Sequence, residues 1–249
     1  IVLLFLILLL MLLNLLYLQW SEVDPAAEGV PRVLIVADPG PDPDDVKVLL
    51  VAAALHHRGE ISLAGVVANG GHQSWERAVL AKAILTAAGA GKVRVGIGTA
   101  GESYLPKPHE YRFPGCAEVR DKDLEDGAAL IRSVLKKAAP RSLLVQCQSG
   151  LTDIANIMEQ EKDLFLAKVA AVSVQGGLTP SKDASNGYGW VPDQSANNVI
   201  DMHAAEFLYN FCFKHRMTMH VVQESAVPPL PISLAKSFAK KGCPVLEYL

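Results

Sequence analysis

The residues best suited to chemistry lie in one acidic turn, which places four carboxylates within eight residues. They are Asp38, Asp42, Asp44 and Asp45. Four like charges this close together repel one another strongly unless a cation neutralises them. Because the turn offers oxygen ligands and no Cys or His, it predicts Ca²⁺ or Mg²⁺ rather than Zn²⁺. The alternative is a solvated turn in which Asp44 caps the following helix.

The segments around this turn place it at the edge of a sheet. Residues 33–37 are an apolar run typical of a buried strand, and residues 46–55 have the composition of an apolar helix. The acids therefore follow the carboxyl end of a strand, where open α/β sheets bind their ligands.

The rest of the chain alternates between strand-like and helix-like segments. The predicted strands are residues 33–37, 63–68, 93–97, 143–146, 169–174 and 219–222. The predicted helices are residues 44–57, 75–88, 124–137, 152–165, 204–214 and 232–240. This alternation favours an α/β fold in which helices cover both faces of a mainly parallel sheet.

Two long connections interrupt the alternation, at residues 99–123 and 176–200. Loops of this length usually carry function or are disordered. The second loop supplies amide, carboxylate and aromatic groups suited to a sugar or a base, among them Asn186, Asp193 and Asn197. The alternative is an ordinary glycine-rich surface loop in which Asn tolerates left-handed backbone.

Length, charge and cysteine content narrow the function classes. We expect one large domain, because 249 residues suffice to bury a sizeable core. A formal net charge of −3 and the absence of a long basic run argue against a nucleic-acid surface and favour small-molecule partners. The four cysteines form no Cys-x-x-Cys pair, so they indicate neither a zinc site nor a disulfide framework.

The first twenty residues are almost wholly apolar and long enough to cross a bilayer. We interpret residues 1–20 as a signal peptide or a signal-anchor transmembrane segment, and residues 21–31 as a linker. The expected product is secreted or membrane-anchored.

Five patches, taken in order, resemble the inosine-uridine preferring nucleoside hydrolase family. Asp38-Pro39-Gly40 and Asp44-Asp45 look like the two halves of its Asp-Pro-Gly-x-Asp-Asp turn, separated by two extra residues. The other patches are Val66-Val67-Ala68-Asn69-Gly70, Ser149-Gly150-Leu151-Thr152-Asp153, Val174-Gln175-Gly176-Gly177 and Asn197-Asn198-Val199-Ile200-Asp201. The resemblance implies a Rossmann-like sheet with a Ca²⁺ ion at the bottom of a pocket, within a nucleoside hydrolase-like domain of residues 32–249.

The resemblance also assigns roles by position. Asp38 matches the aspartate that touches the metal and acts as general base, and Asp45 matches a bidentate metal ligand. Thr152 matches the threonine whose main-chain carbonyl ligates the ion, and the insertion leaves Asp42 as a substitute ligand. Matches to substrate-binding residues are Asp44, Asn69 and Asn197 for the ribose hydroxyls, and Asn186 near the 5′-hydroxyl.

Three departures from the family pattern bear on activity. Val36 stands where the family has a further aspartate before Asp-Pro-Gly. Ser195 replaces the glutamate that binds the 5′ side of ribose, with Asp193 as its stand-in. The family's later His-Asp pair has no match in residues 223–249. We expect part of the domain's C-terminal end to be missing, and the pair is either in that part or truly absent. The general acid is not evident, and His72 and His109, both in loops, are the candidates.

The leading hypothesis is a calcium-dependent enzyme that hydrolyses the N-glycosidic bond of ribonucleosides to free base and ribose. Its rival is a catalytically impaired relative that binds a nucleoside or a sugar. The expected partners are a nucleoside, a membrane contacted through residues 1–20 and a second copy of the chain, with no nucleic acid.

Overall fold

The computed structural model describes residues 29–40, 43–70, 73–99, 113–182 and 185–223, and five single positions between 226 and 237. Its centre is a seven-stranded sheet in which every neighbouring pair of strands is parallel. In sheet order the strands are β4 (Glu125–Asp126), β3 (Val95–Ile97), β2 (Ser62–Ala68), β1 (Arg32–Ala37), β5 (Leu143–Cys147), β6 (Val169–Gln175) and β9 (Thr218–Val222).

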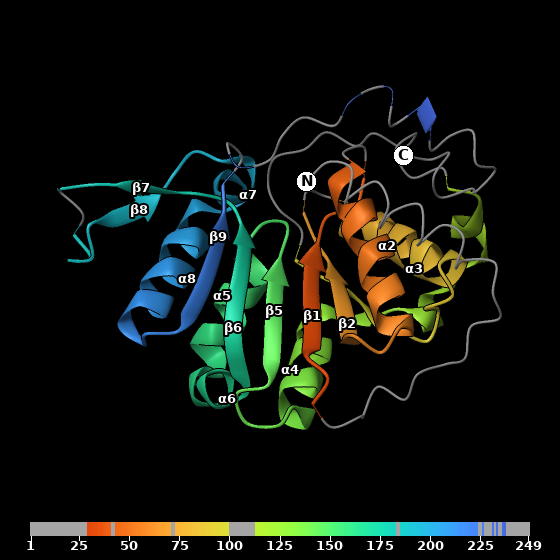
Figure 1. The fold of residues 1–249 in the computed structure, drawn as a ribbon, viewed down its shortest axis with the longest axis horizontal. Coiled ribbons are helices and arrows are strands. Elements are labelled where there is room, and N and C mark those ends of the chain that lie inside the picture. Colours follow the sequence, from red (N-terminus) through yellow and green to blue (C-terminus); the bar gives the residue numbers. More distant parts are fainter. Residues whose placement is uncertain are drawn as a thin grey trace.

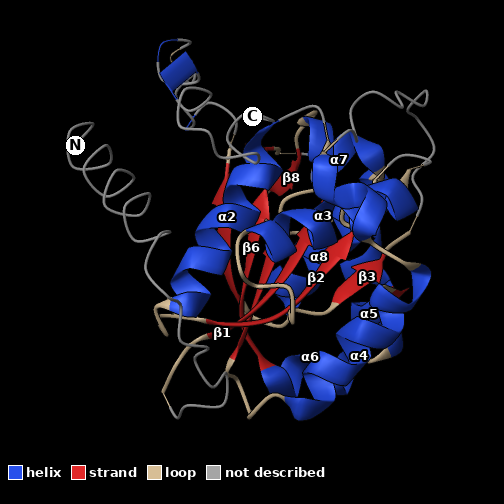
Figure 2. Cartoon of the chain, turned by 90° about the vertical axis from the view of Figure 1, so that its right-hand side faces the viewer, coloured by secondary structure: helices blue, strands red, loops and turns tan. Residues whose placement is uncertain are grey.

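Helices lie against both faces of this sheet, which confirms the predicted α/β class (Figures 1 and 2). On one face lie α2 (Pro43–His57) and α3 (Ser74–Ala87). On the other face lie α4 (Gly127–Lys137), α5 (Thr152–Gln160), α6 (Lys162–Lys168) and α8 (Met202–Lys214). The connection before α8 adds the short helix α7 (Ala196–Ile200).

The alternation of side chains along β1 divides the core into two layers. Leu34 and Val36 pack with the helices α4, α5 and α8, whereas Ile35 and Ala37 pack with α2 and α3. All four side chains are at most 2% exposed. A strand covered on both faces must be apolar throughout, which is why residues 33–37 show no polar alternation.

The structure also differs from the predicted elements in several places. The helix predicted over residues 152–165 is interrupted at Glu161, which separates α5 from α6. The start of the helix predicted at residue 124 is instead β4, and Asp126 caps α4 by accepting the N–H of Ala129 at 2.7 Å. The second long loop contains the antiparallel pair β7 (Leu178–Pro180) and β8 (Trp190–Pro192). The first loop contains the 3₁₀ turns η2 (Pro114–Glu118) and η3 (Asp121–Asp123).

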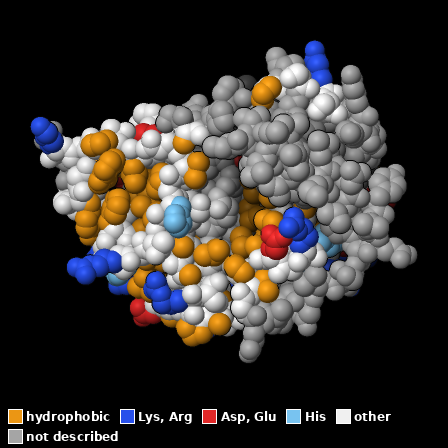
Figure 3. All heavy atoms as spheres, in the orientation of Figure 1, with side chains coloured by type: hydrophobic (Ala, Val, Ile, Leu, Met, Phe, Trp, Pro, Cys, Tyr) orange, Lys and Arg blue, Asp and Glu red, His pale blue; other side chains and the backbone are white. Residues whose placement is uncertain are grey.

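One end of the sheet has no helix over it on the α2 side, among the residues described. Leu144 of β5 is 36% exposed there and Val222 of β9 is 41% exposed. Figure 3 shows hydrophobic side chains at the surface over this part of the sheet. The helical cover on the α2 side therefore extends over β1, β2 and β3 alone within the described ranges.

Within those ranges no helix has the length and hydropathy needed to span a bilayer. Residues 1–20, the predicted signal or anchor segment, lie outside the described part of the chain, as does most of the helix predicted over residues 232–240.

Candidate active site

The acidic turn lies where the strand order of the sheet changes direction. It connects β1 to α2, and β1 is flanked by β2 on one side and β5 on the other. Chain connections leave this point in opposite directions, and in doubly wound sheets such a switch point opens a crevice at the carboxyl ends of the strands. The predicted position of the acids is therefore the position at which this fold binds ligands. Asp42 lies outside the described residues.

Asp45 is the buried carboxylate of the turn, with only 3% of its surface exposed. Its Oδ1 accepts the backbone N–H of Asp38 at 3.2 Å, which closes the turn on itself. Burial raises the pKa of Asp45 well above its usual value, and the nearby carboxylates of Asp38 and Asp44 raise it further. The three described acids thus act on one another as like charges in a partly desolvated site.

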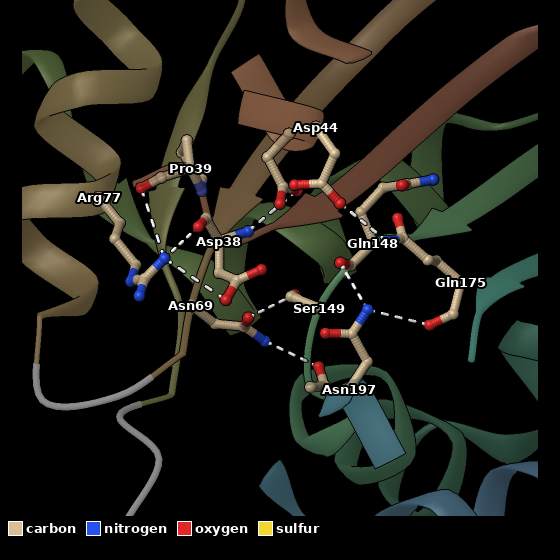
Figure 4. Close-up of polar contacts among 11 residues, drawn as sticks. Asp38, Pro39, Asp44, Asn69, Arg77, Gln148, Ser149, Gln175 and Asn197 are labelled. Carbon is tan, nitrogen blue, oxygen red and sulfur yellow. Dashed lines mark hydrogen bonds and ion pairs between the residues drawn. The ribbon is translucent and has the colours of Figure 1, made fainter. Parts of the chain in front are cut away.

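A second set of contacts links Asp44 to the ends of β5 and β6 (Figure 4). Asp44 Oδ2 accepts a hydrogen bond from Gln175 Nε2 at 2.8 Å. Asn197 Nδ2 donates to the backbone oxygens of Gln148 at 2.9 Å and Gln175 at 3.0 Å. The structure therefore brings together Asp44 and Asn197, both predicted to bind ribose, through Gln175.

Asn69 is also close to the turn, but its amide is already engaged by the protein. Its Nδ2 donates to the Gly150 carbonyl at 3.0 Å and to Asp153 Oδ2 at 2.6 Å, while its Oδ1 accepts the Ser149 hydroxyl at 2.5 Å. Asp153 Oδ1 further accepts the N–H and hydroxyl of Thr99 at 2.9 and 2.7 Å. Asn69 is 2% exposed, so this network primarily ties the ends of β2, β3 and β5 to α5.

The remaining predicted site residues occupy different surroundings. Thr152 begins α5, and its hydroxyl donates to Asp201 Oδ2 at 2.8 Å. Asp193 follows β8, and its Oδ1 accepts the Ser195 N–H at 2.9 Å and Asn198 Nδ2 at 3.1 Å. A Cβ on Gly177 would lie 1.8 Å from Asp193 Oδ2, so only glycine fits beside this carboxylate.

Among the described residues, no hydrogen bond joins Asn186 to the acidic turn. Its Nδ2 donates to the Trp190 carbonyl at 2.8 Å and to Asn210 Oδ1 at 2.7 Å, and its Oδ1 accepts the Tyr188 N–H at 2.9 Å. These bonds join Asn186 to the β7–β8 hairpin and to α8. Its predicted contact with a 5′-hydroxyl stays a prediction.

The donor set of the turn suits a hard divalent cation in chemical type. Asp38 and Asp45 offer only oxygen, which Ca²⁺ and Mg²⁺ prefer, and a dication would relieve the repulsion between them. No group of three or more His, Cys, Asp or Glu side chains that could hold one ion occurs among the described residues. Asp38 and Asp45 would thus supply part of a shell, to which Asp42 and the Thr152 carbonyl are the predicted additions.

Several residues that shape the site received no role from the sequence. Gln175 holds Asp44, Asp153 holds Asn69, and Arg77 of α3 contacts Asp38 through its guanidinium. The sequence does contain an indication that Arg77 is buried, because helical spacing places it on the same face as the buried Leu80 and Ile84. A charged residue on a core-facing stripe requires a buried partner.

We expect Asp45→Asn to stabilise the cation-free protein. The raised pKa means that the folded state holds this proton to higher pH than the unfolded chain, so folded-state stability falls as the pH rises through that pKa. Asparagine keeps an oxygen for the Asp38 N–H and removes the charge. In chelator, the thermal midpoint of the variant should exceed that of the wild type at pH 7, and the gain should shrink as the pH falls toward about 3.9, the ordinary Asp value.

The matched control for this stability measurement is Asp163→Asn, an exposed acid of α6. This control should leave the midpoint unchanged at both pH values. An Asp45→Asn midpoint at or below that of the wild type at pH 7 would show that the buried carboxylate is not a source of instability.

Comparison with known proteins adds to this geometry. No protein-family model matches the sequence, and no curated protein is significantly similar to it. Among solved structures, the type III effector protein XopQ, complexed with adenosine diphosphate ribose, aligns at a TM-score of 0.75 with 26% identity over 97% of this chain and 68% of its own. The effector protein XOO4466 aligns at 0.75 with 25% identity over 98% of this chain and 68% of its own.

The nucleoside hydrolases share the fold at lower identity. The inosine-uridine preferring nucleoside hydrolase from Bacillus anthracis aligns at a TM-score of 0.67, with 16% identity over 88% of this chain and 75% of its own. A purine-preferring ribonucleoside hydrolase from Gardnerella vaginalis aligns at 0.61, with 18% identity over 87% and 71% of the two chains. The chain therefore has the fold of the nucleoside hydrolases, and its acidic turn lies at the switch point of that fold.

Proposed function

We propose that the protein hydrolyses the N-glycosidic bond of ribonucleosides, releasing the free base and ribose, with Ca²⁺ as its cofactor. One observation carries the proposal. At the carboxyl end of β1, a partly exposed carboxylate, Asp38, adjoins a buried one, Asp45, while Asp44 is held by Gln175. This combination places a base for water and polar groups for a sugar at one edge of the sheet.

The reaction makes two demands that these residues meet. Cleaving an N-glycosidic bond develops oxocarbenium character on the sugar and requires a water on the face opposite the base. Asp38, whose side chain is 19% exposed, is accessible to take the proton of that water. Its negative charge also stabilises the developing cation.

The groups at the ends of β5 and β6 are proposed to bind the ribose. Gln175 fixes Asp44 by one oxygen, so the carboxylate is oriented to accept a ribose hydroxyl. Both Nδ2 hydrogens of Asn197 are bound to backbone carbonyls, which leaves its Oδ1 to accept a second hydroxyl. Asn69, engaged by Asp153 and Ser149, keeps the adjoining strand ends in register.

The proposed cofactor adds to what the side chains do. When bound by Asp38 and Asp45, Ca²⁺ would orient the water and the ribose diol and lower the pKa of the water. The carboxylates themselves remain the groups that move the proton and contact the sugar. Positioning is expected to supply most of the rate enhancement.

A second candidate function is ligand binding without turnover. Val36, in place of the family's further aspartate, is fully buried in the core and contributes no charge to the site. Ser195, in place of the glutamate, has a buried Oγ with no hydrogen-bond partner among the described residues. XopQ, at 26% identity, was solved with adenosine diphosphate ribose. These observations favour a ribosyl ligand that is bound at this strand edge and not cleaved.

Release of free base distinguishes the two functions. We expect the calcium-loaded protein to liberate hypoxanthine, uracil or adenine from inosine, uridine or adenosine, as followed by liquid chromatography. Chelation should reduce the rate to background and added Ca²⁺ should restore it. Calorimetric titration of the same sample with adenosine diphosphate ribose completes the comparison. Binding without any base release would contradict the hydrolase and support the second function.

A further inference from the structure

A buried arginine lies directly beneath the acidic turn. Arg77 belongs to α3, and its side chain is only 8% exposed. Burying a guanidinium costs several kcal/mol unless it is paired and hydrogen-bonded. The contacts that Arg77 makes therefore show what this charge is for.

The guanidinium meets both the backbone and the carboxylate of the turn (Figure 4). Arg77 Nη1 donates to the Asp38 carbonyl and, at 3.5 Å, to the Pro39 carbonyl. The same nitrogen lies 3.4 Å from Asp38 Oδ2. One nitrogen thus contacts the main chain on which Asp38 is mounted and the side chain that would do the chemistry.

Two glycines leave the space that this arrangement needs. A Cβ on Gly40 would lie 3.0 Å from Arg77 Nη1, so a side chain there would press on the guanidinium. Gly70, with a φ of +91°, also approaches Asp38 closely, because a Cβ on it would lie 3.0 Å from Asp38 Cβ and 3.2 Å from Oδ2. Asp38 is therefore held between Arg77 and Gly70 with little room to turn.

We propose that Arg77 is the positioning residue of the acidic turn: it fixes the Asp38 carboxylate and partly neutralises it. The inference deepens the proposed function and rests on it for the role of Asp38. Without a positive charge at this point, Asp38, Asp44 and Asp45 would repel one another across the turn. The guanidinium offsets that repulsion from the protein side, and the 19% of the Asp38 side chain that stays exposed is left for the reaction.

The test compares Arg77→Met and Arg77→Lys with Lys82→Met as the matched control. Lys82 lies on the same helix, and its Nζ donates to the carbonyls of Gly91 at 2.7 Å and Val93 at 3.1 Å, away from the turn. Lys82→Met thus removes a half-buried cation and two backbone bonds from α3 without touching Asp38. Arg77→Lys keeps the charge but lacks the planar fork.

Two readouts decide the proposal. In the base-release assay, Arg77→Met should lower kcat by about 100-fold, the loss expected for a misplaced reacting group, with KM within about threefold. Arg77→Lys should recover at least about tenfold of that loss because the charge is retained. In hydrogen–deuterium exchange, the peptide covering residues 33–45 should exchange faster in Arg77→Met and at the wild-type rate in Lys82→Met.

The exchange readout keeps this proposal separate from the proposed function. If the wild type releases no base, the hydrolase proposal fails, and exchange in residues 33–45 still decides the role of Arg77. Equal exchange in Arg77→Met and Lys82→Met would overturn the positioning role. If Arg77→Met does not fold, Arg77→Lys is compared with Lys82→Met, and faster exchange in residues 33–45 is again required.

Discussion

Replacing Asp38 by alanine is expected to lower kcat for base release by about 10³-fold or more, the range over which a general base contributes. Asp38 combines the two properties that the reaction needs. Its carboxylate is 19% exposed, and its main-chain N–H and carbonyl are fixed by Asp45 and Arg77. Removing the carboxylate leaves the water without a proton acceptor. Initial rates with inosine at saturating calcium measure the effect.

The controls separate the charge of Asp38 from its shape. Asp38→Asn keeps the size of the side chain and should lose nearly as much activity, because a neutral amide does not accept the proton. Asp163→Ala, at an exposed position of α6, should retain wild-type kcat. Turnover within tenfold of the wild type in Asp38→Ala would refute the assignment of Asp38 as the base.

Asp153→Ala is expected to produce the largest loss of stability, about 1.5–3 kcal/mol, the contribution of hydrogen bonds to a charged group. The carboxylate is 5% exposed and accepts bonds from Asn69 Nδ2 and from the N–H and hydroxyl of Thr99. Its loss leaves the buried Asn69 amide without one of its acceptors, whereas the exposed Thr99 can turn to water. Urea unfolding monitored by circular dichroism gives the free energy directly.

Asp126→Ala provides the matched comparison for Asp153. Asp126 also accepts a backbone N–H, that of Ala129, but at the exposed start of α4. Loss of a helix cap of this kind costs about 1 kcal/mol. If the two substitutions destabilised the protein equally, the network around Asn69 would not be a buried anchor of the fold.

The fold and the location of the site could be predicted because both depend on local patterns. The apolar run of β1 and the acids that follow it specify a strand end in a parallel sheet, and the structure places Asp38 there. The break between α5 and α6 had no such signal, since residues 152–165 contain neither Pro nor Gly. The chain breaks at Glu161 because α5 and α6 pack as two separate short helices. Hydrophobic periodicity does not reveal such a break.

The partners of the site residues could not be predicted, because they come from distant parts of the chain. Asn69 hydrogen-bonds Asp153 and Ser149 only because the ends of β2 and β5 lie close together in the folded protein. The hold of Gln175 on Asp44 depends equally on the placement of β6. For Asn186 the loop composition predicted contact with a sugar or a base. In the structure its amide donates instead to Asn210, because the β7–β8 hairpin directs it there.

The parallel order of the sheet has a consequence for folding. The Gln175–Asp44 bond joins residues 131 positions apart, and the Asn69–Asp153 bond joins residues 84 positions apart. Parallel neighbours require crossover connections, so such contacts form only after long segments of chain have closed. The site thus exists only in a chain whose two halves have already joined at β1 and β5. A ligand that binds there binds the native state alone, and it therefore stabilises the whole domain against unfolding.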